Sequence, residues 1–142
     1  MLTTINATQA RKEWSTVVDS VVRQKPVFIK RTRDCMMLSD VGIIENMLDA
    51  YKFHAELFVE SNGSMTISLD EIDLVENGVD ERDAINKIAY GIMDYAEDYY
   101  SNFTYWYSAP NRKAHLPYVM KALILGNVEK IGGIIECRHG GN

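Results

Sequence analysis

Residues 53–69 read FHAELFVESNGSMTISL, and this stretch decides the fold of the larger part of the chain. Apolar and polar positions alternate over residues 53–60 and again over residues 64–69, which is the period of a half-buried β-strand. Asn62 and Gly63 stand between the two runs, and an Asn-Gly pair tolerates the positive φ values of a tight hairpin turn. The stretch therefore predicts a β-hairpin.

Downstream of the hairpin, residues 70–75 predict a shorter third extended segment. Asp80 is a favourable N-cap for a long helix that reaches about Tyr100, because apolar residues recur there at helical spacing. Two further helices are predicted over residues 117–125 and 128–137, the first opened by a proline and stopped by a glycine. This part of the chain reads β-β-(β)-α followed by C-terminal helices.

Upstream of the hairpin, the pattern predicts a β-α-β-β-α head. A short β-branched run is followed by a helix that Asn6 or Thr8 can cap and that Pro26 terminates. Two strands joined by a turn come next, and then a second helix. The expected elements are a strand at 3–6, a helix to about 24, strands at 27–30 and 35–38, and a helix at 41–52. The fold class is α+β, divided into domains 1–52 and 53–142.

The length and composition of the chain limit the classes of protein to which it can belong. The chain has 142 residues, of which 46% are hydrophobic and 10% aromatic, enough for a packed core. No apolar run reaches the roughly 18 residues of a membrane span, and the N-terminus lacks the pattern of a signal peptide. The two cysteines, Cys35 and Cys137, are too few for a disulfide framework. We therefore expect a cytoplasmic protein without membrane contact.

Charge is distributed unevenly along the chain. Residues 1–34 hold seven of the fifteen Lys and Arg residues but only three of the twenty Asp and Glu residues, for a net charge of +4. The remaining residues carry a net charge of −9, which gives −5 for the whole chain. The basic head is suited to approach an anion, whereas the acidic remainder is suited to water or to a basic partner.

The basic residues of the head fall into two groups. Arg11 and Lys12 lie near the start of the first predicted helix, and Lys30, Arg31 and Arg33 lie where a strand enters its turn. Side chains of this kind can clamp phosphates or contact guanine edges. When these basic residues are considered without the other features of the sequence, an ordinary solvent-exposed surface explains them equally well.

These residues resemble the Phd/YefM antitoxins through TTINATQAR at 3–11, PVFIKR at 26–31 and MMLSD at 36–40. The resemblance implies an N-terminal DNA-binding dimer and a C-terminal part that folds onto a toxin. It also implies that Arg11 and Arg31 contact operator DNA and that Thr8 positions the first helix against a phosphate. Members of the family often carry a glycine in the turn after the strand arginine, where this chain has Thr32-Arg33-Asp34. Arg33 can therefore join the DNA contacts.

The sequence favours self-association of the head. About fifty residues cannot bury side chains such as Trp14, Val18, Val22 and Met37 well within one copy. Two paired heads would present two basic patches to a palindromic site. The alternative is that the second part of the same chain covers this apolar surface.

The second part is similar to HicB-type antitoxins through FHAELFVESNG at 53–63, ISL at 67–69, ENG at 76–78 and DERDAI at 80–85. That similarity implies a partial RNase-H-like fold without nuclease activity, whose partner is a small basic ribonuclease. The Pro-Gly-rich segment usual after the second strand is replaced here by DEIDL at 70–74. The similarity therefore supports the architecture more than the partner.

Acidic and aromatic residues of the second part are candidates for partner binding. Asp70, Glu71 and Asp73 belong to an acidic run that a solvated surface, a metal site or a surface for a basic toxin would each explain. Tyr105 and Trp106 belong to an aromatic run that can anchor a protein partner or pack in the core. His115, Cys137 and His139 match no zinc-ligand spacing, so no metal and no cofactor are expected.

Together these features predict a type II antitoxin that represses its own operon and is not an enzyme. Its head would dimerise and bind operator DNA, and its tail would bind a co-encoded toxin, expected to be a ribonuclease. One alternative is a stand-alone transcriptional regulator whose C-terminal domain senses a ligand in an aromatic pocket. Another is an enzyme that uses the acidic cluster.

Overall fold

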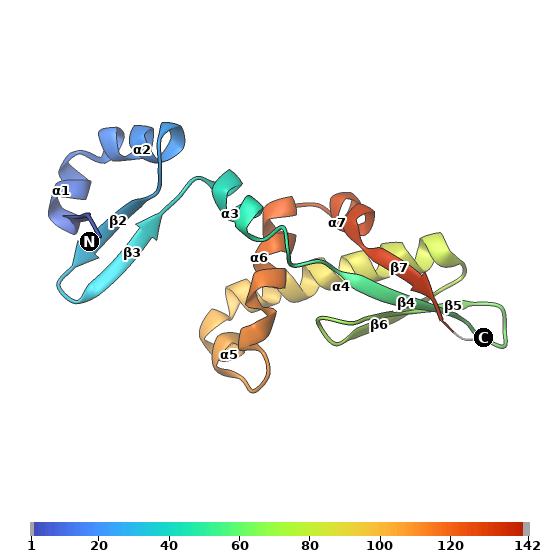
Figure 1. Ribbon diagram of the computed structural model, residues 1–142. Helices are drawn as coiled ribbons and strands as arrows, with labels where there is room; N and C mark the ends of the chain where they lie inside the picture. The colour runs from blue at the N-terminus through green and yellow to red at the C-terminus, as the bar shows by residue number, and fades with distance from the viewer. Residues whose placement is uncertain (1, 141–142) are drawn as a thin grey trace. The chain divides into compact units, whose positions relative to one another are not determined.

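The computed structural model describes residues 2–140, which divide into two compact units (Figure 1). Unit 1 ends at Met47 and unit 2 begins at Leu48. Each unit combines a small β-sheet with helices and has a hydrophobic cluster of its own. The chain is therefore mixed α+β, with two sheets and helices α1 to α7 within the described residues. No helix among these residues combines the length and apolar character that crossing a membrane requires.

Unit 1 has a three-stranded sheet of order β1-β2-β3. β1 runs parallel to β2 and β2 runs antiparallel to β3, so that Asn6 lies opposite Lys30 and Arg31 lies opposite Asp34. The elements are β1 (Thr4–Asn6), α1 (Ala7–Lys12), α2 (Trp14–Arg23), β2 (Val27–Arg31), β3 (Asp34–Leu38) and α3 (Val41–Met47).

The helix predicted to run to residue 24 is in fact two helices. Asn6 caps α1 as predicted, since its side chain accepts a hydrogen bond from the Gln9 amide at 2.7 Å. Glu13 leaves helical geometry, with φ −109° and ψ 33°, and separates α1 from α2. The apolar residues of the two helices are only partly buried. Ala10, Val17 and Val21 are in the core, whereas Trp14 and Val22 are 52% and 60% exposed.

The helix predicted at 41–52 is shorter than expected, because α3 ends at Met47. The following residues make tertiary contacts of unit 2 in place of helical ones. The Lys121 ammonium group donates to the carbonyl of Tyr51 at 2.7 Å and to that of Leu48 at 3.4 Å. The Tyr51 ring also packs edge-on against Tyr118. These contacts are distant in sequence, which is why the local pattern overestimated the helix.

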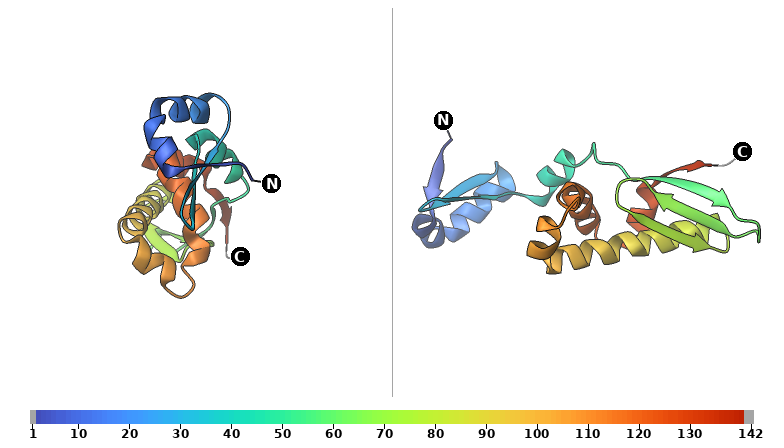
Figure 2. Two further views of the ribbon diagram at one scale, coloured as in Figure 1. Left: turned by 90° about the vertical axis from the view of Figure 1, so that its left-hand side faces the viewer. Right: turned by 90° about the horizontal axis from the view of Figure 1, so that it is seen from below.

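Unit 2 has a four-stranded sheet of order β6-β5-β4-β7, with the long helix α4 along one side (Figure 2). The predicted hairpin is confirmed: β4 and β5 pair antiparallel, and Gly63 in the turn has φ +87°. The elements are β4 (His54–Val59), β5 (Met65–Leu69), β6 (Leu74–Gly78), α4 (Glu81–Ser101), α5 (Phe103–Ser108), the 3₁₀ turn η1 (Lys113–His115), α6 (Leu116–Leu125), α7 (Val128–Ile134) and β7 (Glu136–His139).

The C-terminal segment corrects two expectations. The helix predicted to reach residue 137 ends at Ile134, and the strand β7 (Glu136–His139) follows it and pairs parallel with β4. The third extended segment also lies later than predicted, as β6 at Leu74–Gly78 in place of 70–75. In both cases the strand is defined by pairing with a distant partner, β4 or β5, which the local pattern does not reveal.

The core of unit 2 lies between the sheet and α4. Alternate residues of β4 and β5 point toward α4, and α6 and α7 also pack against α4 and contribute Val119, Ala122 and Ile131 to the same core. Gly78, at the end of β6, lies so close to the backbone of Ala84 that a Cβ atom would be 2.8 Å from the Ala84 Cα. The largest fully buried side chains are Tyr99, Phe53, Leu57, Ile67, Ile72, Ile88, Ile92, Ile131 and Val119.

Candidate functional site

The predicted DNA-contact residues of α1 divide between two hollows in unit 1. Thr8 and Lys12, one helical turn apart, line a hollow of about 320 Å³ at the start of α1, together with Asn6, Gln9 and Glu13. Both side chains are exposed. Sequence adjacency grouped Lys12 with Arg11, but the helix directs the two cations to different sides.

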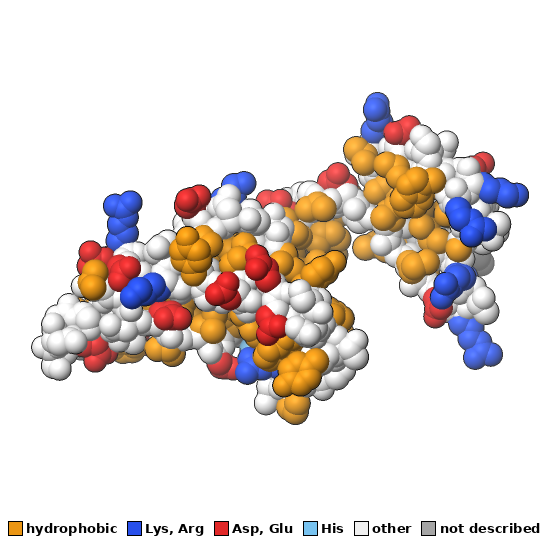
Figure 3. Space-filling view, turned by 180° about the vertical axis from the view of Figure 1, so that it is seen from behind, with side chains coloured by type: hydrophobic (Ala, Val, Ile, Leu, Met, Phe, Trp, Pro, Cys, Tyr) orange, Lys and Arg blue, Asp and Glu red, His pale blue; other side chains and the backbone are white. Residues whose placement is uncertain are grey.

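Arg11 lines a second, apolar hollow of about 460 Å³. Its other lining residues are Ala7, Ala10, Trp14, Ile29 and Met36. Trp14 and Met36 are 52% and 48% exposed, and neighbouring Met37 is 47% exposed. Figure 3 shows hydrophobic side chains gathered on this unit, with Lys and Arg side chains around them. Unit 1 therefore presents an apolar surface bordered by cations.

The remaining predicted cations lie at the tip of the β2–β3 hairpin. Lys30 and Arg31 end β2, and Arg33 is in the turn; all three are exposed. The Arg31 guanidinium lies 3.5 Å from the Asp34 carboxylate, and both side chains are about 70% exposed, at 72% and 70%. A pair this exposed contributes little stability, so Arg31 can exchange Asp34 for another anion at small cost.

The sheet brings the two groups of cations to one end of unit 1. β1 ends at Asn6, which lies opposite Lys30, and α1 starts at the next residue. The start of α1 and the hairpin tip are therefore neighbours, although about twenty residues separate them in sequence. Thr8, Lys12 and the hairpin cations share this end of the unit.

In unit 2, the predicted partner residues Asp70 and Glu71 already have internal partners. The Arg138 guanidinium donates to both Asp70 oxygens, at 2.8 and 3.2 Å, and also to Glu56 at 3.3 Å. The hydrogen bond from Arg138 holds the pKa of the Asp70 carboxyl below its ordinary value. Glu71 accepts from the His54 amide at 2.8 Å and lies 2.7 Å from Nδ1 of the His54 ring.

Asp73, the third predicted acid, lies 3.7 Å from the Arg112 guanidinium but is itself 80% exposed. Arg112 in turn lies over the rings of Tyr95 and Trp106, at 5.8 and 5.6 Å from their centroids. A cation over an aromatic face is favourable, most of all when it is partly desolvated. Asp73 therefore borders a packed cation–aromatic cluster.

The aromatic run is divided between the core and the surface of unit 2. Tyr99 is fully buried, and Trp106 is half-buried with its Nε1 donating to the Asp98 carboxylate at 3.2 Å. Tyr105 packs edge-on against Trp106 but is 70% exposed, and Tyr100 is 66% exposed. Part of the run is core, and part is surface.

Three residues that the sequence did not indicate organise unit 2. Arg138 and His54 link β7 to the acidic residues, since His54 also lies 3.1 Å from Glu136. His115, 7% exposed, lies 2.7 Å from the Tyr95 hydroxyl group, and burial lowers the pKa of His115. The sequence carried no local signal for these pairings, because the partners are between 17 and 82 residues apart.

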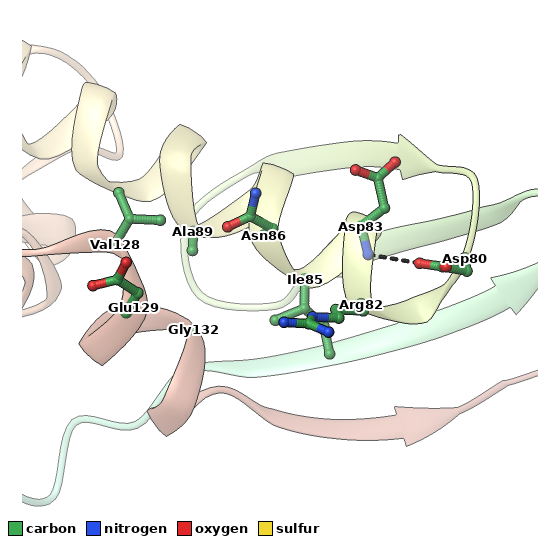
Figure 4. Close-up of a pocket in the computed structure, with 9 residues that line it drawn as sticks. All are labelled: Asp80, Arg82, Asp83, Ile85, Asn86, Ala89, Val128, Glu129 and Gly132. Carbon is green, nitrogen blue, oxygen red and sulfur yellow. Dashed lines mark hydrogen bonds between the residues drawn. The ribbon is translucent and has the colours of Figure 1, made fainter.

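A groove of about 600 Å³ lies between the start of α4 and α7 (Figure 4). Its charges are mixed: Asp80, Asp83, Arg82 and Glu129 all line it. Asp80 Oδ1 accepts from the Asp83 amide at 2.8 Å, so this amide of the helix start is already occupied (Figure 4). Within residues 2–140 no cluster of three or more His, Cys, Asp or Glu residues is arranged to hold a metal ion.

Comparison with known proteins places these features in context. Residues 1–137 match a family model described as PHD_like, antitoxin of toxin-antitoxin, RelE/RelB, TA system. The crystal structure of the antitoxin part of a proposed toxin/antitoxin system from Syntrophomonas wolfei subsp. wolfei is similar, with 40% sequence identity and a TM-score of 0.92. The match covers 98% of this chain and 100% of the other. No curated protein matches at a significant level.

Proposed function

The chain belongs to this PHD_like family of toxin–antitoxin antitoxins, and from that premise we propose that unit 1 binds operator DNA as a dimer while unit 2 neutralises a co-encoded ribonuclease. An antitoxin has a toxin as its partner, and the family suggests a regulatory, non-enzymatic role. The observation that carries the proposal is the gathering of cations at one end of unit 1, next to an exposed apolar hollow.

The DNA-binding part rests on charge and accessibility. Lys12, Lys30 and Arg33 are exposed and share the end of the sheet with Thr8, so they can approach a phosphate backbone together. Arg31 has an exposed acidic partner that a phosphate or a guanine edge can replace. Arg11 lies at the border of the apolar hollow, where dimerisation would fix its position relative to the DNA.

The dimer part rests on the small core of unit 1. Its buried apolar residues are Ala10, Val17, Val21 and Ile29, which is little for an independent unit. Trp14 and Met36 remain about half exposed at the hollow of about 460 Å³. A second copy placed on this surface would bury the exposed residues and pair two groups of cations, as a palindromic operator requires.

The toxin part rests on the family and on the charge of unit 2. Residues 48–142 hold eight Lys and Arg against fifteen Asp and Glu, a net charge of −7, which complements a basic protein and would repel nucleic acid. A ribonuclease is proposed because an enzyme that binds RNA presents a basic surface. The alternative of ligand sensing has weaker support, since the cavity bordered by Tyr95, Trp106 and Arg112 measures about 140 Å³, small for a ligand site.

DNA binding is tested by gel shift with the promoter region of the operon. Replacing both Arg11 and Arg31 with Ala should weaken binding by about 1–3 kcal/mol for each residue that contacts a base edge. Arg23→Ala is the matched control, because Arg23 is an exposed arginine of the same unit at the far end of α2. If the double variant and the control bind the promoter DNA with equal affinity, Arg11 and Arg31 are not the DNA contacts.

Dimerisation is tested separately by analytical ultracentrifugation. Met36 is 48% exposed, so Met36→Glu places a charge in the exposed apolar surface and should convert a dimer to a monomer. A monomeric wild-type chain would refute the dimer.

Toxin neutralisation is tested by adding the chain to the product of the adjacent gene and following RNA cleavage, which should stop at equimolar antitoxin.

A further inference from the structure

We propose that the toxin docks on the outward face of α4 and the adjoining α5, through a surface of its own that is rich in Lys and Arg. This inference rests on the proposed neutralisation of a toxin by unit 2 and locates the contact. We call the surface the acidic tyrosine face; it consists of Tyr90, Asp94, Glu97, Asp98, Tyr100 and Tyr105.

The helical period places the centre of this face opposite the core. Tyr90, Asp94 and Glu97 are spaced i, i+4 and i+7, so they form one stripe about 10 Å long on α4. Ile88, Ile92, Ala96 and Tyr99 occupy the other side of the helix and are buried. All three stripe residues are exposed, and the Tyr90 side chain is 55% accessible to solvent.

The charge of the face has one sign. The charged residues of the face are Asp94, Glu97 and Asp98; Lys87, one turn before Tyr90 on the same side of α4, is paired with Asp83 at 3.5 Å. Within the part of the chain that the structure describes, Asp94 and Glu97 form no ion pair and accept no side-chain hydrogen bond. Figure 3 shows carboxylate side chains next to hydrophobic ones on the exposed surface of unit 2.

The sequence-predicted acids differ from these in having partners. Asp70 and Glu71 are held by Arg138 and His54, so docking a toxin cation on them would break contacts that already exist. Asp94 and Glu97 would exchange only water for the cation. Charge complementarity therefore favours α4 over the acidic run at 70–73 as the place for a basic partner.

The tyrosines supply the apolar part of an interface. Tyr100 and Tyr105 are 66% and 70% exposed, and interface centres are enriched in residues of this type. Tyr105 is also held in place, because it packs on Trp106, whose Nε1 donates to Asp98 at 3.2 Å. Asp98 also accepts from the Asn102 amide group at 2.7 Å. Side chains already fixed in this way lose little entropy when a partner binds.

A basic protein fits this face better than nucleic acid. The three carboxylates of the face repel phosphates, so the face is poorly suited to stack on the bases of RNA or DNA. The Lys and Arg residues of a toxin surface would instead pair with Asp94 and Glu97 while its apolar groups contact the tyrosine rings. The remaining possible occupant is the basic unit 1 of a second copy, which the experiment distinguishes.

The test measures binding of the full-length chain to the purified product of the adjacent gene by isothermal titration calorimetry. Asp94→Lys with Glu97→Lys should raise the Kd more than tenfold, because two attractions become repulsions. Glu60→Lys with Glu129→Lys is the control of equal charge change, on exposed residues away from the face, and should change the Kd by less than about threefold. Tyr105→Ala should also weaken binding, without altering charge.

Thermal unfolding of each variant checks that folding is intact, as expected for exposed side chains. Equal Kd values for the charge-reversed variant and the control would overturn this inference while leaving neutralisation standing. No binding by the wild-type chain would overturn the proposed function and the inference with it. If the charge reversal changes the sedimentation of the free chain, the occupant is a second copy and the toxin assignment is wrong.

Discussion

The hydroxyl group of Tyr95 lies 2.7 Å from Nδ1 of His115, in the interior of unit 2. The Arg112 guanidinium lies 3.4 Å from the same nitrogen, and a guanidinium can only donate. Burial, with Arg112 as a second cause, lowers the pKa of His115, and burial raises the pKa of Tyr95. The neutral ring with Nδ1 as acceptor and a protonated phenol is therefore the arrangement that the folded chain favours.

This arrangement predicts a loss of stability in mild acid. Below pH 6.5, the ordinary pKa of a histidine, the unfolded chain takes up a proton at His115 that the folded chain resists. The free energy of unfolding therefore decreases as the pH is lowered. The decrease cannot exceed about 1.4 kcal/mol per pH unit for one proton, and it is absent above about pH 7.5. Urea unfolding measured between pH 5 and 8 should show that the free energy of unfolding changes less with pH in His115→Asn than in wild type. Equal pH dependence of the two proteins would contradict the prediction.

Asp70 should titrate at a lower pH than an ordinary aspartate because Arg138 donates to it. Replacing Arg138 with Met should return the pKa of Asp70 toward 3.8, as measured by NMR titration of side-chain carboxyl groups. In wild type, Asp70 adds stability above its unfolded pKa, and this is lost as pH falls through the folded value. Asp83 is the internal control, since its low pKa arises mainly from the Val79 amide and should not move.

Gly78 is needed for the close approach of β6 to α4. A methyl group there would lie 2.8 Å from the Cα of Ala84, a backbone atom that cannot rotate away. Gly78→Ala should lower the free energy of unfolding of unit 2 by about 1–3 kcal/mol, the usual cost of overpacking. Gly133→Ala in α7 is the control, because nothing lies within 4 Å of its added methyl group. Chemical denaturation of both variants measures the difference.

Thr32 adopts φ +54° in the β2–β3 turn, a conformation that a β-branched side chain disfavours. Thr32→Gly should therefore stabilise unit 1 by about 0.5–1 kcal/mol, the net of relieved strain and added chain entropy. Trp14 fluorescence in a Trp106→Phe background reports unit 1 alone, since the chain has two tryptophans. Thr3→Gly, at an exposed N-terminal position, is the control and should not increase the stability of unit 1.

Local patterns were sufficient for the hairpin of β4 and β5, for the Asn6 and Asp80 caps, and for α4. Each of these depends on neighbours in sequence: alternation over a strand, an Asn-Gly turn, or a side chain that reaches an amide three residues ahead. The charge division between residues 1–34 and the remainder is likewise a property of composition alone. These features follow from the order of the residues, whatever the tertiary fold.

Only the tertiary structure decided which carboxylates have no internal ion-pair partner and are free to contact another protein. Asp70 and Glu71 looked like free acids in the sequence, but the parallel pairing of β7 with β4 brings Arg138 to Asp70, and Glu71 reaches the start of β4 at His54. Asp94 and Glu97, by contrast, are exposed on α4 and form no ion pair among the described residues. Arg138 and Asp70 are 68 residues apart and His54 and Glu71 are 17 apart, so neither pair leaves a periodic signal. Ion pairing depends on distance in space and not along the chain.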